Sequence, residues 1–202
     1  LLEELKKYIN LPMGLSNDAN CAALGEVIAG AAREYHNAVM ITLGTGVGGG
    51  VVIDKKIFEG GHAGGTELGH TTILSGGEYC TCGRHGCFEA YASATALIRD
   101  TKRAAKKYPH SLLNQLCEGN LEHINGVTPF DAAKQGDPAA KEVVENYIKY
   151  LGEGIINMVN IFRPDVVLLS GGICNQGAYL TDPLNDYIKK YCFAGTRVYI
   201  PP

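Results

Sequence analysis

Four residues of the types that bind zinc lie close together in the sequence: His70, Cys80, Cys82 and Cys87. One imidazole and three thiols match the ligand set of a tetrahedral zinc ion. Glycines in the same stretch supply the tight bends that would bring such near neighbours onto one ion. The alternatives are unliganded thiols or a disulfide. A disulfide fits poorly, because Cys80 and Cys82 are too close to pair easily and one cysteine would be left over.

This ligand set predicts a structural metal rather than a catalytic one. Three cysteines and one histidine fill the four positions around zinc and leave none for water. The ion would hold in shape a glycine-rich stretch, residues 60–86, that we expect to be irregular. The remaining cysteines lack such neighbours and are interpreted as ordinary thiols: Cys21, Cys117, Cys174 and Cys192.

Carboxylate and amide side chains occur beside this stretch and upstream of it. Glu67 precedes the histidine by three residues, and Glu89 follows the last cysteine by two. Carboxylates can accept hydrogen bonds from adjacent hydroxyl groups of a sugar, although a lone glutamate is more often a solvated surface group. Asn17 and Asp18 have an equally plain explanation, because both residue types are favoured at the N-termini of helices.

Two glycine-rich turns could contact phosphates or a nucleotide. A strand rather than a helix is predicted after Gly44–Gly48 in LGTGVGGGVVI, which excludes a dinucleotide fingerprint, and a P-loop lysine is absent. Such a turn can still aim backbone N–H groups at phosphate, or can be a plain hairpin. Gly171-Gly172 ends the apolar run DVVLLSGG. Ligands of open α/β sheets bind beyond such strand ends, although a simple strand-to-helix turn has the same composition.

Both helices and strands are needed to position these residues. An amphipathic helix is expected to end within residues 1–10, and a capped helix to run from 16–18 to about 30. Strands are predicted over 37–44, 48–54 and 55–60. Helices are then predicted over 87–107, 129–135 and 138–162, followed by a strand over 165–172, a helix over 181–192 and a strand over 196–200. Asp137-Pro138 is expected to begin the longest of these helices, because Asp suits the cap and Pro the first helical position. Its predicted apolar face comprises Val143, Val144, Ile148, Leu151, Ile155, Ile156 and Val159. This order of elements predicts an α/β fold whose mixed sheet starts antiparallel and ends with parallel crossovers.

The overall composition limits the class of protein. The chain has 202 residues, of which 46% are hydrophobic and 19% charged, as in an ordinary globular domain. A net charge of −3 offers no basic surface for nucleic acid, and no apolar run is long enough to span a membrane. Seven cysteines, an odd number, favour reduced thiols in a chain of this size. We therefore expect a cytoplasmic protein.

The stretch GTELGH, followed by CTCGRHGCFE, resembles the signature of the ROK family of sugar kinases and sugar-responsive repressors. The shared pattern is E-x-G-H and then C-x-C-G-x-x-G-C-x-E, with zinc on the histidine and cysteines. SNDAN, GTGVGGG and SGG extend the likeness over nearly the whole chain, and the sequence most resembles bacterial ATP-dependent glucokinases. The resemblance implies an actin-like ATPase (ribonuclease H-like) lobe that carries a zinc-bound loop.

The resemblance also implies which residues hold the sugar. Asp18 would be the catalytic base, and Asn17, with Asn20 as a further candidate, would hold sugar hydroxyls. Glu67, His70 and Glu89 would contact hydroxyls near the anomeric carbon. His70 would use one ring nitrogen for zinc and the other for the sugar.

On the nucleotide side, the resemblance implies that Gly44, Thr45 and Gly46, together with Gly48, lie near the β- and γ-phosphates. Gly171 and Gly172 would lie against the adenosine. Mg²⁺ held by ATP would neutralise the charge that develops during phosphoryl transfer.

The family's kinases also have an N-terminal lobe with a D-x-G-G-T phosphate loop, which residues 1–202 do not contain. Residues 1–12 are therefore expected to be the tail of that lobe, and residues 13–202 the C-terminal sugar- and zinc-binding lobe. The expected function is ATP-dependent phosphorylation of glucose to glucose 6-phosphate, with this chain inactive by itself. A sugar-responsive repressor, or a kinase for fructose, N-acetylmannosamine or allose, remains an alternative. We expect a homodimer that binds no membrane and, as a kinase, no nucleic acid.

Overall fold

A mixed four-stranded sheet of order β3-β2-β1-β4 organises the computed structural model, which describes residues 1–14, 16–61 and 65–193. The strands are β1 (Ala38–Leu43), β2 (Val47–Ile53), β3 (Lys56–Ile57) and β4 (Val166–Ser170). β1 pairs antiparallel with β2 and parallel with β4. The predicted antiparallel start and parallel crossover are therefore confirmed, and the strand predicted over 196–200 lies outside the described residues.

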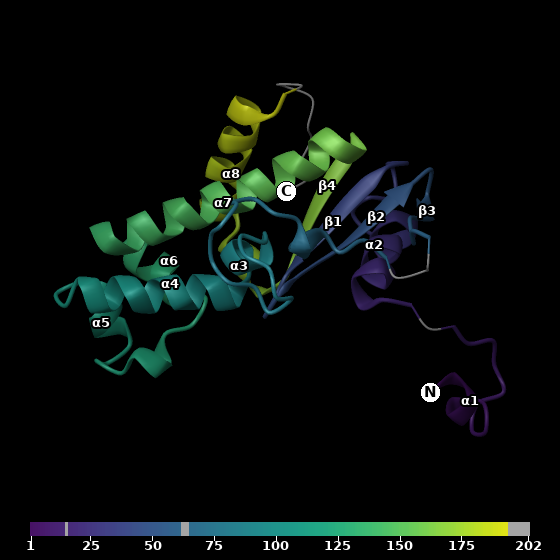
Figure 1. Ribbon diagram of the computed structural model, residues 1–202, viewed down its shortest axis with the longest axis horizontal. Coiled ribbons are helices and arrows are strands. Elements are labelled where there is room, and N and C mark those ends of the chain that lie inside the picture. The colour runs from purple at the N-terminus through teal and green to yellow at the C-terminus, as the bar shows by residue number, and fades with distance from the viewer. Residues whose placement is uncertain (15, 62–64, 194–202) are drawn as a thin grey trace.

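Helices cover both faces of the sheet (Figure 1). Side chains alternate along β1 as the period of a strand requires. Ala38 and Met40 pack in a small core with Ala23 and Val27 of α2 (Asp18–Ala29). The intervening residues of β1 belong instead to the main core, which includes most of the buried residues of the long helix α7 (Pro138–Phe162).

The main core confirms the predicted apolar face of α7. All seven residues of that face are buried: Val143, Val144, Ile148, Leu151, Ile155, Ile156 and Val159. They form core rather than an exposed interface. α6 (Thr128–Lys134) and α8 (Ala178–Tyr191) pack against α7, and α8 begins three residues earlier than predicted.

The single helix predicted over 87–107 is wrong. The chain forms a short helix α3 (Glu89–Ala92) and then a separate helix α4 (Ala94–Lys107). Ser93 divides them, because its backbone is extended and its side chain accepts a hydrogen bond from the Ala96 N–H, as an N-cap does.

Several shorter elements complete the described chain. α1 (Leu2–Leu5) is shorter than the helix predicted there, buries no residue and lies apart from the sheet in Figure 1. α5 (Leu112–Leu116) and the 3-10 helices η1 (Leu68–His70), η2 (Leu121–His123) and η3 (Gly172–Gln176) were not predicted. Within the described residues, no helix is long and apolar enough to cross a membrane.

Asp137 begins α7 as predicted and also ties it to α5. Its buried carboxylate accepts hydrogen bonds from the Ala140 N–H at 2.8 Å, the Leu112 N–H at 2.9 Å and the Ser111 hydroxyl at 2.9 Å. Burial alone would raise the pKa of Asp137, but these hydrogen bonds outweigh it and hold the pKa below its ordinary value.

The glycine run of β2 lets two other segments approach the strand closely. A Cβ on Gly50 would lie 2.6 Å from Ala23 Cβ in α2, and one on Gly49 would lie 2.5 Å from Leu68 Cδ1 in η1. Because successive residues of a strand face opposite sides, α2 and η1 pack on opposite faces of β2. The glycines thus bring the N-terminus of α2 and the residues around His70 to the same end of the sheet.

Candidate metal and ligand site

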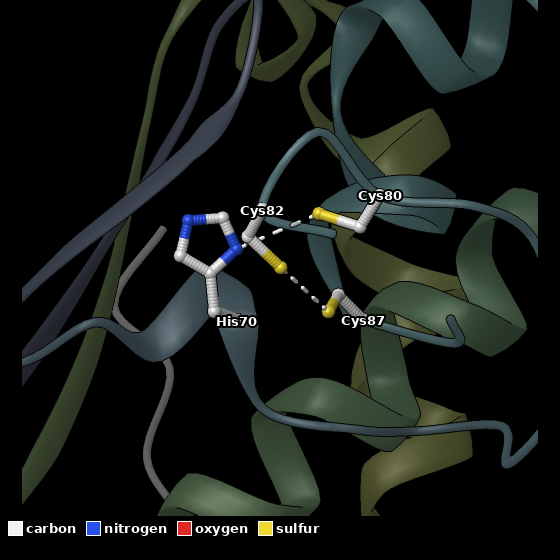
Figure 2. Close-up of side chains that lie close together, drawn as sticks. All are labelled: His70, Cys80, Cys82 and Cys87. Atoms are coloured by element: carbon white, nitrogen blue, oxygen red, sulfur yellow. Dashed lines mark hydrogen bonds between the residues drawn. The ribbon is translucent and has the colours of Figure 1, made fainter. Parts of the chain in front are cut away.

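The four predicted metal ligands converge in space. His70 Nδ1 lies 3.6 Å from Cys80 Sγ, and Cys82 Sγ lies 3.6 Å from Cys87 Sγ (Figure 2). One ligand atom from each of the four residues lies within 4.8 Å of every other. Residues 70–87, called the metal loop from here on, therefore bring all four candidate ligands to one point.

These separations fit a tetrahedral zinc ion. Bonds of about 2.3 Å to sulfur and about 2.0 Å to nitrogen, at tetrahedral angles, separate two sulfurs by about 3.8 Å and sulfur from nitrogen by about 3.5 Å. The observed 3.6 Å distances lie close to both values. Burial and the neighbouring thiols raise the pKa of Cys87 to about 12. A zinc ion bound here would favour the thiolate form that metal ligation uses.

Short backbone contacts shape the metal loop. The Cys80 N–H donates to the Arg84 carbonyl at 2.8 Å, and the Gly83 N–H donates back to the Cys80 carbonyl at 2.9 Å, which closes a tight turn. Arg84 also donates to Thr72 Oγ1 at 2.8 Å and to the His70 carbonyl at 3.4 Å. Arg84, which sequence reasoning did not select, therefore connects the tip of the loop to the histidine.

Two of the three predicted sugar-binding residues near the loop have groups available for a ligand. Because His70 turns Nδ1 toward the cysteines, its Nε2 is left for another partner. Glu67, at the N-terminal end of η1, is exposed.

Glu89 is more constrained than the sequence indicates. Its Oε2 accepts a hydrogen bond from the Val47 N–H at 3.1 Å, and its Oε1 lies 3.6 Å from Cys80 Sγ. This carboxylate therefore touches both the β1–β2 turn and the metal loop.

The residues of the SNDAN stretch divide into exposed and buried groups. Asn17 caps α2, since its side-chain oxygen accepts from the Ala19 and Asn20 N–H groups at 2.9 and 3.1 Å. Asp18 is exposed, and its Oδ1 accepts from the Ala19 N–H at 2.8 Å. Asn20 is only 2% exposed, and its Oδ1 has no hydrogen-bond partner within the described chain. Asn20 therefore faces the interior rather than the solvent-exposed side with Asp18.

The structure gathers the predicted sugar residues at one end of the sheet but does not connect all of them. Among the described residues, no hydrogen bond joins Asn17 or Asp18 to Glu67, His70 or Glu89. α2 and η1 approach β2 from opposite faces at Gly48–Gly50. A ligand that contacted both groups would therefore lie across this end of β2.

The turn between β1 and β2 presents unpaired backbone donors. Gly44 and Thr45 are exposed, and the Gly44 N–H donates to the Gly46 carbonyl at 3.0 Å. Within the described residues, the N–H groups of Thr45 and Gly46 donate to no acceptor. Adjacent free N–H groups on an exposed turn can bind an anion such as phosphate.

The second glycine pair lies at the neighbouring strand end. Gly171 has a φ of +114°, and a Cβ there would lie 2.2 Å from the Leu43 carbonyl oxygen at the end of β1. Because β1 and β4 are parallel, the turns at Gly44–Gly46 and Gly171–Gly172 lie at the same sheet edge. The predicted phosphate and adenosine contacts therefore occupy adjacent positions.

A cavity of about 350 Å³ adjoins this turn, lined by residues of the turn, the metal loop and the α3–α4 junction, including Thr45, Gly46, Cys80, Glu89 and Thr95. Sequence reasoning missed Thr95, whose hydroxyl donates to the Thr45 carbonyl at 2.8 Å. The capping serine two residues earlier was a local signal that a new helix starts beside the site.

Comparison with known proteins shows to which protein family the chain belongs. A model of the ROK family matches residues 1–200. The chain belongs to the ROK family. It is 39% identical over 199 residues to a glucokinase of Thermotoga maritima, covering 97% of this chain and 62% of that protein. It is also 32% identical over 194 residues to the xylose repressor of Bacillus subtilis, covering 96% of this chain and 46% of the repressor.

Among solved structures, a ROK family glucokinase of Streptomyces griseus in complex with glucose and AMPPNP has a TM-score of 0.87 with this chain at 32% identity. The match covers 98% of this chain and 66% of that one. This ROK chain therefore has the α/β actin-like ATPase fold with its mixed sheet, as the sequence resemblance implied. The chain spans about 62% of the length of the Thermotoga relative.

Proposed function

We propose that this chain is the C-terminal lobe of an ATP-dependent hexose kinase that transfers the γ-phosphoryl group of ATP to the 6-hydroxyl of glucose. The proposal rests on one observation. The N-terminus of α2, the metal loop and the two glycine turns meet at one end of the sheet. A kinase must bring a sugar and a triphosphate together in this way, because phosphoryl transfer depends mainly on positioning and charge stabilisation.

The sugar would lie across the end of β2, between α2 and the metal loop. Asn17 would donate from its amide group, since its carbonyl oxygen already caps α2. His70 would contribute Nε2, and Glu67 and Glu89 would accept hydrogen bonds from hydroxyls near the anomeric carbon. Carboxylates on both sides of a sugar distinguish hydroxyl positions, which accounts for selectivity among hexoses.

Asp18 would accept the proton of the 6-hydroxyl. One of its oxygens holds the Ala19 N–H, which fixes the side chain and leaves the other oxygen free. The hydroxyl oxygen forms a bond to the γ-phosphorus, the bond from that phosphorus to the β–γ bridging oxygen breaks, and the hydroxyl proton moves to Asp18. The free N–H groups of Thr45 and Gly46 would hold phosphate oxygens, and Mg²⁺ bound with ATP would neutralise their charge.

The metal loop would position the sugar residues and take no part in the chemical step. The four ligands fill a closed tetrahedral set, and zinc bound there would supply a cross-link between His70 and the segment that leads to Glu89. Support for the nucleotide and sugar comes from the Streptomyces griseus relative, a glucokinase in complex with glucose and AMPPNP.

An assay of the protein with both lobes tests the proposal. Wild type should phosphorylate glucose with ATP faster than it does fructose, N-acetylmannosamine or allose, and residues 1–202 alone should show little or no turnover. Asp18→Asn should lower kcat at least about 100-fold while glucose still binds, as expected for loss of a general base. Asp186→Asn, an exposed aspartate of α8, is the matched control and should keep wild-type kcat.

A sugar-responsive repressor is the second candidate, favoured by the 32% identity to the xylose repressor of Bacillus subtilis. Such a protein would bind sugar through the same residues and bind DNA through a domain outside this chain. Sugar binding without turnover, together with sugar-dependent release of DNA by the full-length protein, would replace the kinase assignment with this one.

A further inference from the structure

The segment Glu89–Thr95 holds the β1–β2 turn at three points. The Ala94 N–H donates to the Gly44 carbonyl at 2.8 Å. The Thr95 hydroxyl donates to the Thr45 carbonyl at 2.8 Å. The Glu89 carboxylate accepts from the Val47 N–H at 3.1 Å. The turn is thus fixed from one side by residues that directly follow the metal loop.

The two carbonyl anchors determine where the free N–H groups of the turn point. In a planar trans peptide, the C=O of one residue and the N–H of the next point in opposite directions. Holding the Gly44 carbonyl toward Ala94 therefore turns the Thr45 N–H away from α4. Holding the Thr45 carbonyl toward Thr95 does the same for the Gly46 N–H. These are the two N–H groups of the turn that donate to no acceptor within the described residues.

The third contact brings the turn directly against a side chain. A Cβ built on Gly46 would lie 2.3 Å from Glu89 Oε2, so the backbone at this position lies directly against the carboxylate. A side chain at this position would displace the Glu89 carboxylate from its hydrogen bond with the Val47 N–H.

We propose that Thr95 is a positioning residue for nucleotide binding, because its hydroxyl sets the Thr45–Gly46 peptide so that the Gly46 N–H faces the phosphoryl oxygens of a nucleoside triphosphate. The inference rests on the proposed kinase function and adds a residue to it. Thr95 does not touch the nucleotide and acts only through the turn. Because Cys87, the last residue of the metal loop, lies only two residues before Glu89, the metal loop and the phosphate turn are held by neighbouring parts of the chain.

Steady-state kinetics of the two-lobed protein tests this role with an isosteric substitution. Thr95→Val should raise the KM for ATP about fivefold, the factor expected for one exposed hydrogen bond, and leave the KM for glucose within about twofold. Thr95→Ser keeps the hydroxyl and should restore the wild-type KM for ATP. Thr101→Val is the matched control on the same helix, because its hydroxyl donates to the Leu97 carbonyl at 2.7 Å and does not contact the turn.

Amide hydrogen exchange of the same variants provides a readout that does not depend on catalysis. The Gly44 and Val47 N–H groups are hydrogen-bonded in the turn, so Thr95→Val should speed their exchange several-fold and Thr95→Ser should not. An unchanged KM for ATP in Thr95→Val, in a protein whose wild type phosphorylates glucose, would overturn this inference alone. A wild type that phosphorylates no hexose would overturn the proposed function instead.

Discussion

The metal loop and the helical half of the protein, residues 94–162, meet at α3 but keep their shapes by different forces. The helical half buries large apolar side chains completely, among them Phe130, Leu151 and Ile155. In the metal loop, by contrast, Leu74 is 43% exposed and Tyr79 is 63% exposed. The core beside the loop is small and includes two of the candidate ligands, Cys80 and Cys87.

The two regions therefore differ in which contacts their folds depend on. A fully buried aliphatic or aromatic side chain contributes roughly 1.5–3 kcal/mol, and the helical half has many of them, so no single contact decides its fold. The metal loop has few such contacts and a single point at which four ligand atoms meet. We therefore expect the loop to depend on a bound metal and the helical half to be independent of it.

Metal removal should produce the largest effect. Metal analysis of the native protein should find about one zinc per chain, given one closed four-ligand set. Chelation should sharply increase hydrogen exchange in residues 70–87 while α4 and α7 keep their protection, because a bound zinc would take the place of an apolar core in the loop. Glucose affinity should fall as well, since His70 and Glu89 lose their support.

Substitution of single cysteines separates loss of the ligand from loss of packing. Cys87→Ser should weaken zinc binding more than about 100-fold, beyond the 10- to 100-fold cost typical of losing a supporting contact. Cys117→Ser is the matched control, because Cys117 is equally buried but caps α5 away from the cluster. It should lower the free energy of unfolding and leave one zinc per chain. A Cys87→Ser variant with native zinc content would show that the loop does not depend on this ligand.

The sequence predicted both regions, for different reasons. The four ligands were recognisable by residue type, because thiols and imidazole so close together suit few purposes besides a metal. α7 was recognisable by its period, since all seven predicted apolar positions are buried. Local patterns of this kind need no knowledge of the rest of the fold.

What the sequence did not reveal depends on contacts between distant residues. The helical period continues through residues 89–107, so the break at Ser93 cannot be distinguished from a serine within a helix until the Ala96 N–H is seen to bind it. Glu89 could be predicted as a sugar ligand, but its hydrogen bond to the Val47 N–H joins residues 42 positions apart. α5 has only five residues and depends on the buried Asp137.

Asp137 allows the independence of the helical half to be tested. Asp137→Ala should lower the free energy of unfolding by about 2–3 kcal/mol, because it removes the cap of α7 and leaves the Leu112 N–H and Ser111 hydroxyl without their acceptor. Zinc content should stay at one per chain. Urea denaturation gives the stability, and loss of zinc from a folded Asp137→Ala protein would contradict the separation of the two regions.

Asp137 should also make the free energy of unfolding depend on pH. The folded pKa of Asp137 is held below its unfolded value of about 3.9, so its contribution is complete above that value and is lost as pH falls through the folded pKa. The free energy of unfolding should therefore fall less steeply with acid in Asp137→Asn than in wild type. Equal slopes between pH 5 and pH 3 would show that another group governs the acid transition.

The smallest effect concerns an ionic contact between the two regions. Glu78 of the metal loop accepts hydrogen bonds from Arg103 of α4, which hold the pKa of Glu78 below its ordinary value. The Arg103 side chain is 57% exposed, so solvent screens the pair. Arg103→Gln should cost less than about 1 kcal/mol of stability and weaken zinc binding less than about threefold.

Lys102→Gln, on the same helix, is the matched control for Arg103→Gln. Lys102→Gln breaks the exposed pair between Lys102 and Glu122, which lies away from the metal loop, and should leave zinc affinity unchanged. Arg99 also lies 3.9 Å from Glu78 Oε2, so in Arg103→Gln the loop keeps a second ionic contact with α4. If competition with a chelator showed a loss of zinc affinity in Arg103→Gln as large as that in Cys87→Ser, the loop would owe its shape to the helical half rather than to its metal.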